Sequence, residues 1–185
     1  MRLPNFFRAP PPIDPGTHGR RQAEFCVEAA AYIIDDVSRG IYRHENPLGL
    51  AEAYLNQGLQ EDPTLPRVHN ELAQLYNMRG EFRLAAEENA KGVALQPNNH
   101  KFWYNLAYTY AVHDQVRRAF AAAVVSSYLK PRFRPSKRLI KGGRNDLGGG
   151  EAHTVEGKAR ALFDSMIRDK QVTAETIKSF LGNFG

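Results

Sequence analysis

The chain has 185 residues, among them 25 Lys and Arg and 20 Asp and Glu, for a formal net charge of +5; this length is typical of one domain with tails and a sizeable core. The single cysteine, Cys26, excludes an internal disulfide and suits a reducing compartment. No apolar run approaches the roughly 20 residues needed to cross a bilayer, so we expect no transmembrane segment.

The charge is concentrated in particular segments of the chain. Residues 1–21 carry four Arg against one Asp, whereas residues 22–129 carry nine basic against thirteen acidic residues. Residues 130–144 carry seven basic residues and no acidic one. The basic character therefore belongs to an arm and a short segment, while the central body is acidic.

Residues 1–21 are predicted to form an extended, proline-rich N-terminal arm. Five prolines exclude a helix and argue against a secretory signal. Phe6 and Phe7 are suited to anchor such an arm on a partner surface. We expect a cytoplasmic protein, or a protein of an organelle matrix if the arm is a targeting segment.

Two helices are expected next, over residues 22–38 and 48–60. The first has a wide apolar face that includes Cys26, Ile33 and Ile34, which predicts deep burial. Gly40 and the Asn46–Pro47 pair break the chain between the two helices.

Residues 63–131 contain two rows of equal length that align with each other. Each row predicts two helices with a short break, over residues 67–78 and 81–95 and over residues 101–112 and 115–128. Small residues recur where paired helices must approach, and a proline ends each row. The aligned positions are Leu72–Ala73 with Leu106–Ala107, Tyr76 with Tyr110, Ala85 with Ala119, and Pro97 with Pro131.

The chain changes character after residue 131. Prolines at its start and glycines at its end predict an irregular basic loop over residues 132–150, with one helical turn near Ser136 to Ile140. Helices are expected over residues 154–168 and 173–181, with Thr154 and Thr173 as their N-caps. We interpret residues 151–185 as a helical hairpin that caps the array, or alternatively as a hairpin that docks on another subunit.

The aligned rows resemble the tetratricopeptide repeat, a helix-turn-helix unit whose period, about 34 residues, is also that of the two rows. The matching residues are Leu72, Ala73, Tyr76, Gly80, Phe82, Ala85 and Pro97 in the first row and Trp103, Leu106, Ala107, Tyr110, Ala119 and Pro131 in the second. The resemblance implies an all-α fold with three stacked repeats over residues 22–131, the first of them degenerate. It also implies a scaffold that binds a peptide or partner protein in a concave groove, although a fold does not fix a function.

Catalytic and metal-binding signatures are missing from the sequence. There is no HExxH, CxxC or GxSxG, and the six histidines show no metal-ligand spacing. The glycines of residues 143–148 lack the Lys and Ser/Thr of a phosphate loop. We therefore expect a non-enzyme without a cofactor, in which Cys26 is a core residue.

A peptide groove is the first candidate site. In repeats of this family the first helix of each pair lines the concave face, where amides can bind an extended backbone and tyrosines provide flat apolar area. Alternatively these side chains are merely exposed, or the tyrosines pack between repeats. The expected groove residues are Asn70, Gln74 and Met78, and Lys101, Tyr104, Asn105 and Tyr108.

The basic segment is the second candidate site. Its cations would attract phosphates, but Phe133 is the only aromatic residue among them that could stack on a base. An RNA backbone, an acidic protein face and an anionic membrane surface all remain open, as does a simple solvated loop. The cations are Lys130, Arg132, Arg134, Lys137, Arg138, Lys141 and Arg144.

These features favour a non-catalytic adaptor, either a structural subunit or an assembly factor of a larger complex. An extended arm and a basic loop fold poorly alone but are suited to lie along another surface. The alternatives are an RNA-associated accessory protein that uses residues 130–144, and a small chaperone that holds a client in the groove.

Overall fold

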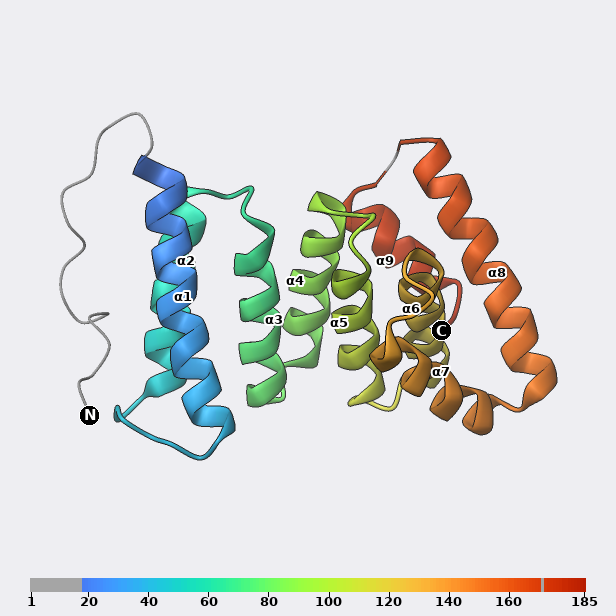
Figure 1. Cartoon of the computed structure of the whole chain (residues 1–185), viewed down its shortest axis with the longest axis horizontal. Coiled ribbons are helices and arrows are strands. Elements are labelled where there is room, and N and C mark those ends of the chain that lie inside the picture. Colours follow the sequence, from blue (N-terminus) through green and yellow to red (C-terminus); the bar gives the residue numbers. More distant parts are fainter. Residues whose placement is uncertain (1–17, 171) are drawn as a thin grey trace. The chain divides into compact units, whose positions relative to one another are not determined.

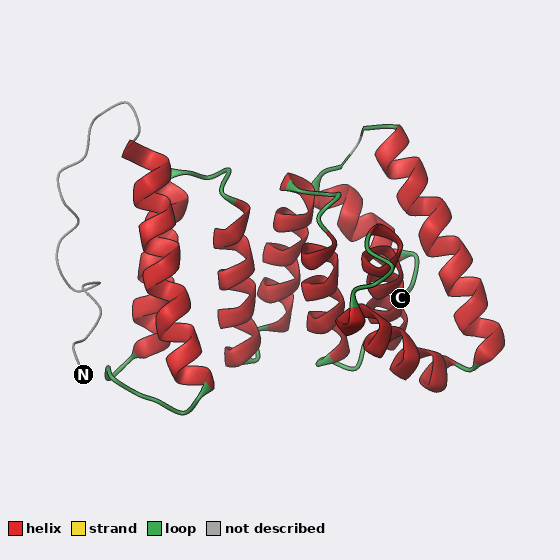
Figure 2. Cartoon of the chain, viewed as in Figure 1, coloured by secondary structure: helices red, strands yellow, loops and turns green. Residues whose placement is uncertain are grey.

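The computed structural model describes residues 18–170 and 172–185, and it shows only α-helices and no strand in that part of the chain (Figures 1 and 2). The expectation of an all-α fold is confirmed. No helix in the described ranges is both long enough and apolar enough to span a bilayer. The helices are α1 (His18–Ser38), α2 (Pro47–Glu61), α3 (Pro66–Arg79), α4 (Phe82–Leu95), α5 (His100–Ala111), α6 (Val116–Leu129), α7 (Arg134–Leu147), α8 (Gly149–Arg168) and α9 (Ala174–Gly182).

The chain divides into two compact units at Leu75 and Tyr76, within α3. In unit 1, α1 packs along α2, and the predicted apolar face of α1 is buried, including Cys26 and Ile34. Gly58 of α2 lies close to α1, since a Cβ there would be 3.6 Å from the Cβ of Cys26. Of the extended arm predicted for residues 1–21, residues 1–17 lie outside the described residues. The prediction is wrong for residues 18–21, which belong to α1. The last proline of the arm, Pro15, precedes them, so nothing in their sequence prevents a helix.

The core of unit 2 is built around Trp103 of α5. Its ring packs edge-on against Phe163 of α8 and Phe180 of α9, with centroid distances of 5.6 and 5.5 Å. Its indole Nε1 donates a hydrogen bond to the carbonyl oxygen of Pro97 at 2.8 Å, which satisfies the polar atom of a fully buried side chain. One aromatic residue thus joins elements from three parts of the sequence.

The prediction of an irregular basic loop over residues 132–150 is wrong, because residues 134–147 form helix α7. Pro135 stands in the first turn of α7, where the missing N–H carries no penalty. Gly143 does not break the helix but lets it approach α6, since a Cβ there would lie 2.8 Å from the Cδ2 atom of Phe120. The buried hydroxyls of Ser126 and Ser136 also meet at 2.7 Å. Glycine and serine therefore permit close helix packing here.

The C-terminal helices also differ from the expectation. Helix α8 begins at Gly149, directly after Gly148 with its φ of +78°, so Thr154 is not an N-cap. Thr154 lies inside the helix and its Oγ1 donates to the carbonyl oxygen of Gly150 at 3.1 Å. The N-cap at Thr173 is confirmed, with a capping box to Thr176. Helix α8 packs on α6 and α7, and α9 returns to α4 and α6, so the two form no tight hairpin with each other.

The starts of alternate helices keep a constant spacing. Helices α3, α5 and α7 begin at Pro66, His100 and Arg134, so the interval from α3 to α5 equals the interval from α5 to α7. The period that the sequence shows up to Pro131 therefore extends into α7, where the repeat's characteristic residues are missing. The alanines predicted at close helix approaches are buried, namely Ala73, Ala85, Ala107 and Ala119.

Candidate functional site

The first part of the expected groove lies on α3. Asn70 is half-buried and its Nδ2 donates a hydrogen bond to Oε1 of Glu71 at 3.3 Å, whereas Gln74 is exposed. Burial raises the pKa of the Glu71 carboxyl, and Asn70 and Arg67 act in the opposite direction. Asn70 and Gln74 belong to unit 1, while Met78 belongs to unit 2. Met78 therefore belongs to the same unit as the groove residues of α5, whereas Asn70 and Gln74 do not.

The remaining groove residues lie on α5, where part of their surface is covered. Lys101 and Tyr108 are exposed, whereas Tyr104 and Asn105 are half-buried. The ring of Tyr104 packs edge-on against Phe133, with a centroid distance of 5.4 Å and an interplanar angle of 88°. The segment that leads into α7 thus covers the first half of this face, and Tyr108 stays open to solvent at 48% exposure.

An exposed apolar patch remains around Tyr108. Val112 follows it by one helical turn and is 47% exposed, and Met78 at the end of α3 is 37% exposed. Nδ2 of Asn77 donates to Oγ1 of Thr109 at 2.8 Å, which ties the end of α3 to α5. We call Met78, Tyr108 and Val112 the α5 patch.

The lining of one pocket divides the seven cations of residues 130–144 into two groups. All seven are exposed or half-exposed, and three of them line a pocket beside α8. The other four stand before α7 or on α7 outside the pocket lining. At 3.6 residues per turn, the five cations on α7 fall within about 120° of arc, so the helix carries one basic face, of which the pocket takes a part. The pocket group is Lys137, Lys141 and Arg144, and the second group is Lys130, Arg132, Arg134 and Arg138.

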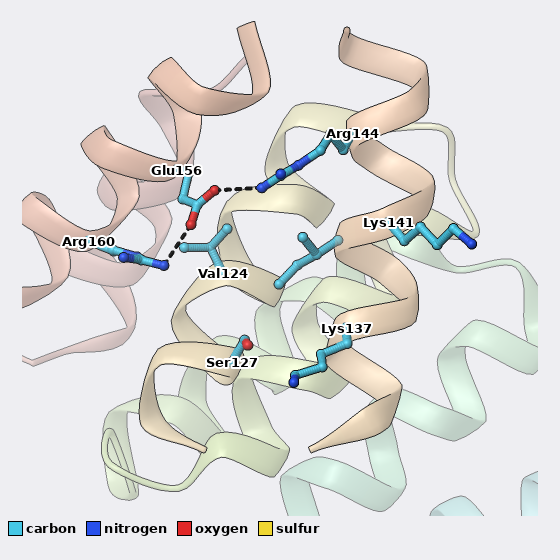
Figure 3. A pocket seen from close by; sticks show the side chains of 8 residues that line it. Val124, Ser127, Lys137, Lys141, Arg144, Glu156 and Arg160 are labelled. Atoms are coloured by element: carbon cyan, nitrogen blue, oxygen red, sulfur yellow. Dashed lines mark hydrogen bonds and ion pairs between the residues drawn. The ribbon is translucent and has the colours of Figure 1, made fainter. Parts of the chain in front are cut away.

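The pocket lies between α6, α7 and α8 and has a volume of about 340 Å³ (Figure 3). Lys137 and Arg144 point into it, whereas the amine of Lys141 points away. Glu156 of α8 binds two guanidinium groups, that of Arg144 at 2.8 Å and that of Arg160 at 2.6 Å. We call this the α6–α8 pocket; its lining residues are Val124, Ser127, Lys137, Ile140, Lys141, Arg144, Glu156 and Arg160.

The sequence analysis missed Ser127, Glu156 and Arg160 as members of this pocket. Glu156 and Arg160 are four residues apart, a spacing that favours an ion pair on a helix. That signal was present, but it does not indicate that α8 packs beside α7. The link between α7 and α8 comes from tertiary packing and has no local sequence pattern.

Histidine chemistry near the start of α7 is limited by burial. His100 packs edge-on against Phe133, with a centroid distance of 4.7 Å. Burial lowers the pKa of the His100 imidazole, and the positive charges of Lys130 and Lys101 lower it further. This histidine therefore favours its neutral form and adds no charge to the basic segment.

The described residues contain neither a metal-binding cluster nor a reactive thiol. Within residues 18–170 and 172–185, no group of three or more His, Cys, Asp or Glu side chains is placed to hold a metal ion. Cys26 is buried in unit 1, as predicted for a core residue, and burial is the main factor that raises the pKa of its thiol. The thiol thus stays protonated and unreactive at neutral pH.

The α5 patch and the α6–α8 pocket are therefore two surfaces of unit 2 with a composition suited to binding. The resemblance to the tetratricopeptide repeat rests on the aligned residues of the two rows, for which helix spacing gives a physical context. Neither the protein-family models nor the curated proteins gave a match to this chain.

Proposed function

We propose that this chain is a non-catalytic adaptor, a structural subunit or assembly factor of a larger complex, which holds a partner segment on the α5 patch. The observation that carries the proposal is Tyr108, a large aromatic side chain of α5 that is 48% exposed. Tyrosine gives a partner flat apolar area and a polar tip at a low entropic cost, and aromatic residues dominate binding energy at interfaces.

The neighbours of Tyr108 support a peptide or protein ligand. Val112 and Met78 extend the apolar area, and Lys101 on the same helix adds a charge at its edge. Methionine adapts its shape to different partners because its side chain is unbranched and polarisable. An apolar centre with a polar rim is the usual composition of a protein interface.

We further propose that the helices are stacked helix-turn-helix repeats of the tetratricopeptide type. The equal spacing between the starts of α3, α5 and α7 supports this arrangement. By the same spacing, α7 and α8 take the place of a further helix pair, which sequence alone assigned to a loop and a cap. Contacts of α7 with α5 and α6, and of α8 with α6, agree with such a pair.

The test is affinity purification of the tagged full chain from its native source, followed by quantitative mass spectrometry. Substitution Tyr108→Ala should reduce a stoichiometric set of proteins by at least about tenfold, since loss of an interface hot spot costs about 2 kcal/mol or more. Tyr42→Ala is the matched control, because Tyr42 is 70% exposed but lies in the loop between α1 and α2. Equal recovery of all proteins with both variants would contradict the proposal.

A second candidate, an RNA-associated accessory protein, is favoured by the cations outside the pocket. Lys130, Arg132, Arg134 and Arg138 are exposed and make no ion pair with any acidic residue in the described part of the chain. Nuclease treatment during the same purification separates the two functions. An adaptor keeps its partners after nuclease treatment, whereas an RNA-associated protein loses them and releases them at a lower salt concentration.

A further inference from the structure

We propose that the α6–α8 pocket binds the phosphate monoester of a phosphorylated side chain on a partner protein. This inference rests on the proposed adaptor function, because it identifies the chemistry of a partner segment. It concerns a surface other than the α5 patch, one that Ser127, Glu156 and Arg160 join only through tertiary packing. Three features carry it: the positions of the cations, their total charge and the apolar floor.

The two arginines of the pocket are held in place by one carboxylate. Oε2 of Glu156 accepts from Nη2 of Arg144 at 2.8 Å, and Oε1 accepts from Nη2 of Arg160 at 2.6 Å. Each guanidinium has five N–H donors, so each retains donors for a further acceptor. The side chains of both arginines are about half exposed, at 53% and 51%, while that of Glu156 is 22% exposed. Glu156 thus orients two accessible guanidinium groups without saturating them.

Lysine and serine complete the donor set from two other helices. Lys137 of α7 points into the pocket toward Ser127 of α6 (Figure 3). Lys137 makes no ion pair with an acidic side chain among residues 18–170 and 172–185. The Ser127 hydroxyl can donate one hydrogen bond. A ligand in the pocket would therefore meet a positive ammonium group, a hydroxyl and two guanidinium groups.

The charge of this set selects the class of anion. Lys137, Arg144 and Arg160 contribute three positive charges and Glu156 one negative charge, a net charge of +2. Lys141, the fourth cation of the lining, is left out of this sum because its amine points away from the pocket (Figure 3). A phosphate monoester carries about −1.5 to −2 charges at pH 7, because its second pKa is about 6. A carboxylate or a phosphodiester carries one negative charge and would leave the pocket positive. Guanidinium groups also bind phosphate oxygens in a bidentate manner that a lysine cannot reproduce.

The floor of the pocket strengthens these interactions. Val124 is 2% exposed and Ile140 is half-buried, and both line the pocket. Apolar groups beneath a charge pair exclude water and lower the local dielectric, which makes the Coulomb interaction stronger than on an open surface. The floor also provides contact for the carbon chain that carries the phosphate.

The experiment is calorimetric titration of the full chain with blocked phosphoserine, and with blocked serine, blocked glutamate, inorganic phosphate and a single-stranded RNA oligomer as comparison ligands. Blocked phosphoserine should bind more tightly than every other small ligand, and its affinity should rise from pH 5 to pH 7 as the monoester loses its second proton. Arg160→Gln should weaken its binding at least about tenfold, because a hydrogen bond to a charged group contributes about 1.5–3 kcal/mol. Arg168→Gln is the matched control, since Arg168 is exposed on the same helix outside the pocket.

Two lysines of α7 provide the sharpest comparison. Lys137→Gln should weaken phosphoserine binding at least about fivefold, whereas Lys141→Gln should change it less than about twofold, because the amine of Lys141 points away from the pocket. Thermal unfolding of every variant confirms that it is folded.

Several results would overturn the proposal. Equal losses with Lys137→Gln and Lys141→Gln, or tighter binding of the RNA oligomer with the same losses, would assign the cations to a diffuse nucleic-acid surface. Binding of inorganic phosphate without binding of blocked phosphoserine would assign the pocket to a free ion. None of these titrations uses a partner protein or the α5 patch, so the pocket proposal can fail while the effect of Tyr108→Ala on partner recovery stands.

Discussion

Substitution Gly143→Ala tests whether glycine sets the distance between α6 and α7. An alanine Cβ at this position would lie 2.8 Å from Cδ2 and 3.3 Å from Cβ of Phe120, a side chain that is 1% exposed. In an open helix interior, glycine to alanine stabilises by about 1 kcal/mol. Overpacking of a well-packed core costs about 1–3 kcal/mol. We therefore expect a net destabilisation of up to about 2 kcal/mol.

Gly142→Ala is the matched control, since it lies one residue earlier in the same helix. A Cβ at residue 142 meets no atom within 4 Å, so this variant should gain the helix propensity without a clash. The free energy of unfolding should then be lower for Gly143→Ala than for Gly142→Ala by about 1–3 kcal/mol.

Urea unfolding of the two variants measures this difference directly. The fluorescence of the single tryptophan, Trp103, reports on the core of unit 2, and circular dichroism reports on helix content. Similar slopes of the unfolding free energy against urea would show that only stability changed. If the two variants were equally stable, Phe120 would not restrict residue 143, and the explanation given for helix α7 would be refuted.

Three further substitutions test the electrostatics and the capping. Burial raises the pKa of Glu71, so its ionised form destabilises the fold and stability falls as the pH rises through the raised pKa. Glu71→Gln should therefore raise the melting temperature at pH 7 and make it depend less on pH. An unchanged melting profile would contradict this reasoning. Burial lowers the pKa of His100, so the unfolded chain binds this proton more readily, and stability is lost as the pH falls below the ordinary histidine pKa of 6.5. His100→Asn should lessen the loss of stability between pH 7 and pH 5. The same loss in the variant and the unchanged protein would count against this reasoning. Thr173→Ala removes the capping box of α9 and should cost about 0.5–2 kcal/mol in calorimetric unfolding, with Thr173→Ser as a control that keeps the cap.

The fold class and the central helices were predictable because their signals are local. The apolar period of the aligned rows, the buried alanines and the closing prolines all depend on residues within one helix pair. The N-cap at Thr173 is likewise local, and its capping box forms. These local rules succeeded because the neighbours in space are also near in sequence, but the equally local N-cap expected at Thr154 failed, since α8 begins at Gly149.

The sequence analysis missed helix α7 because Gly143 is compatible with either a turn or a close helix–helix contact. Gly143 favours a turn by local propensity, but its lack of a side chain is also what admits Phe120 of α6. Sequence alone cannot show that Phe120 lies opposite. The same limit hid the α6–α8 pocket, since Ser127 and Arg160 meet only after α7 and α8 have packed on α6.

The position of α9 determines when the core of unit 2 can be completed during synthesis. The chain leaves the ribosome N-terminus first, at about 5–20 residues per second. Helices α4 and α6 are made long before α9, which packs on both, and Trp103 gains Phe180 as a neighbour only at the end. Before α9 has been made, Trp103 keeps Phe163 as a neighbour but lacks Phe180, so the core of unit 2 is closed only once α9 packs on α4 and α6.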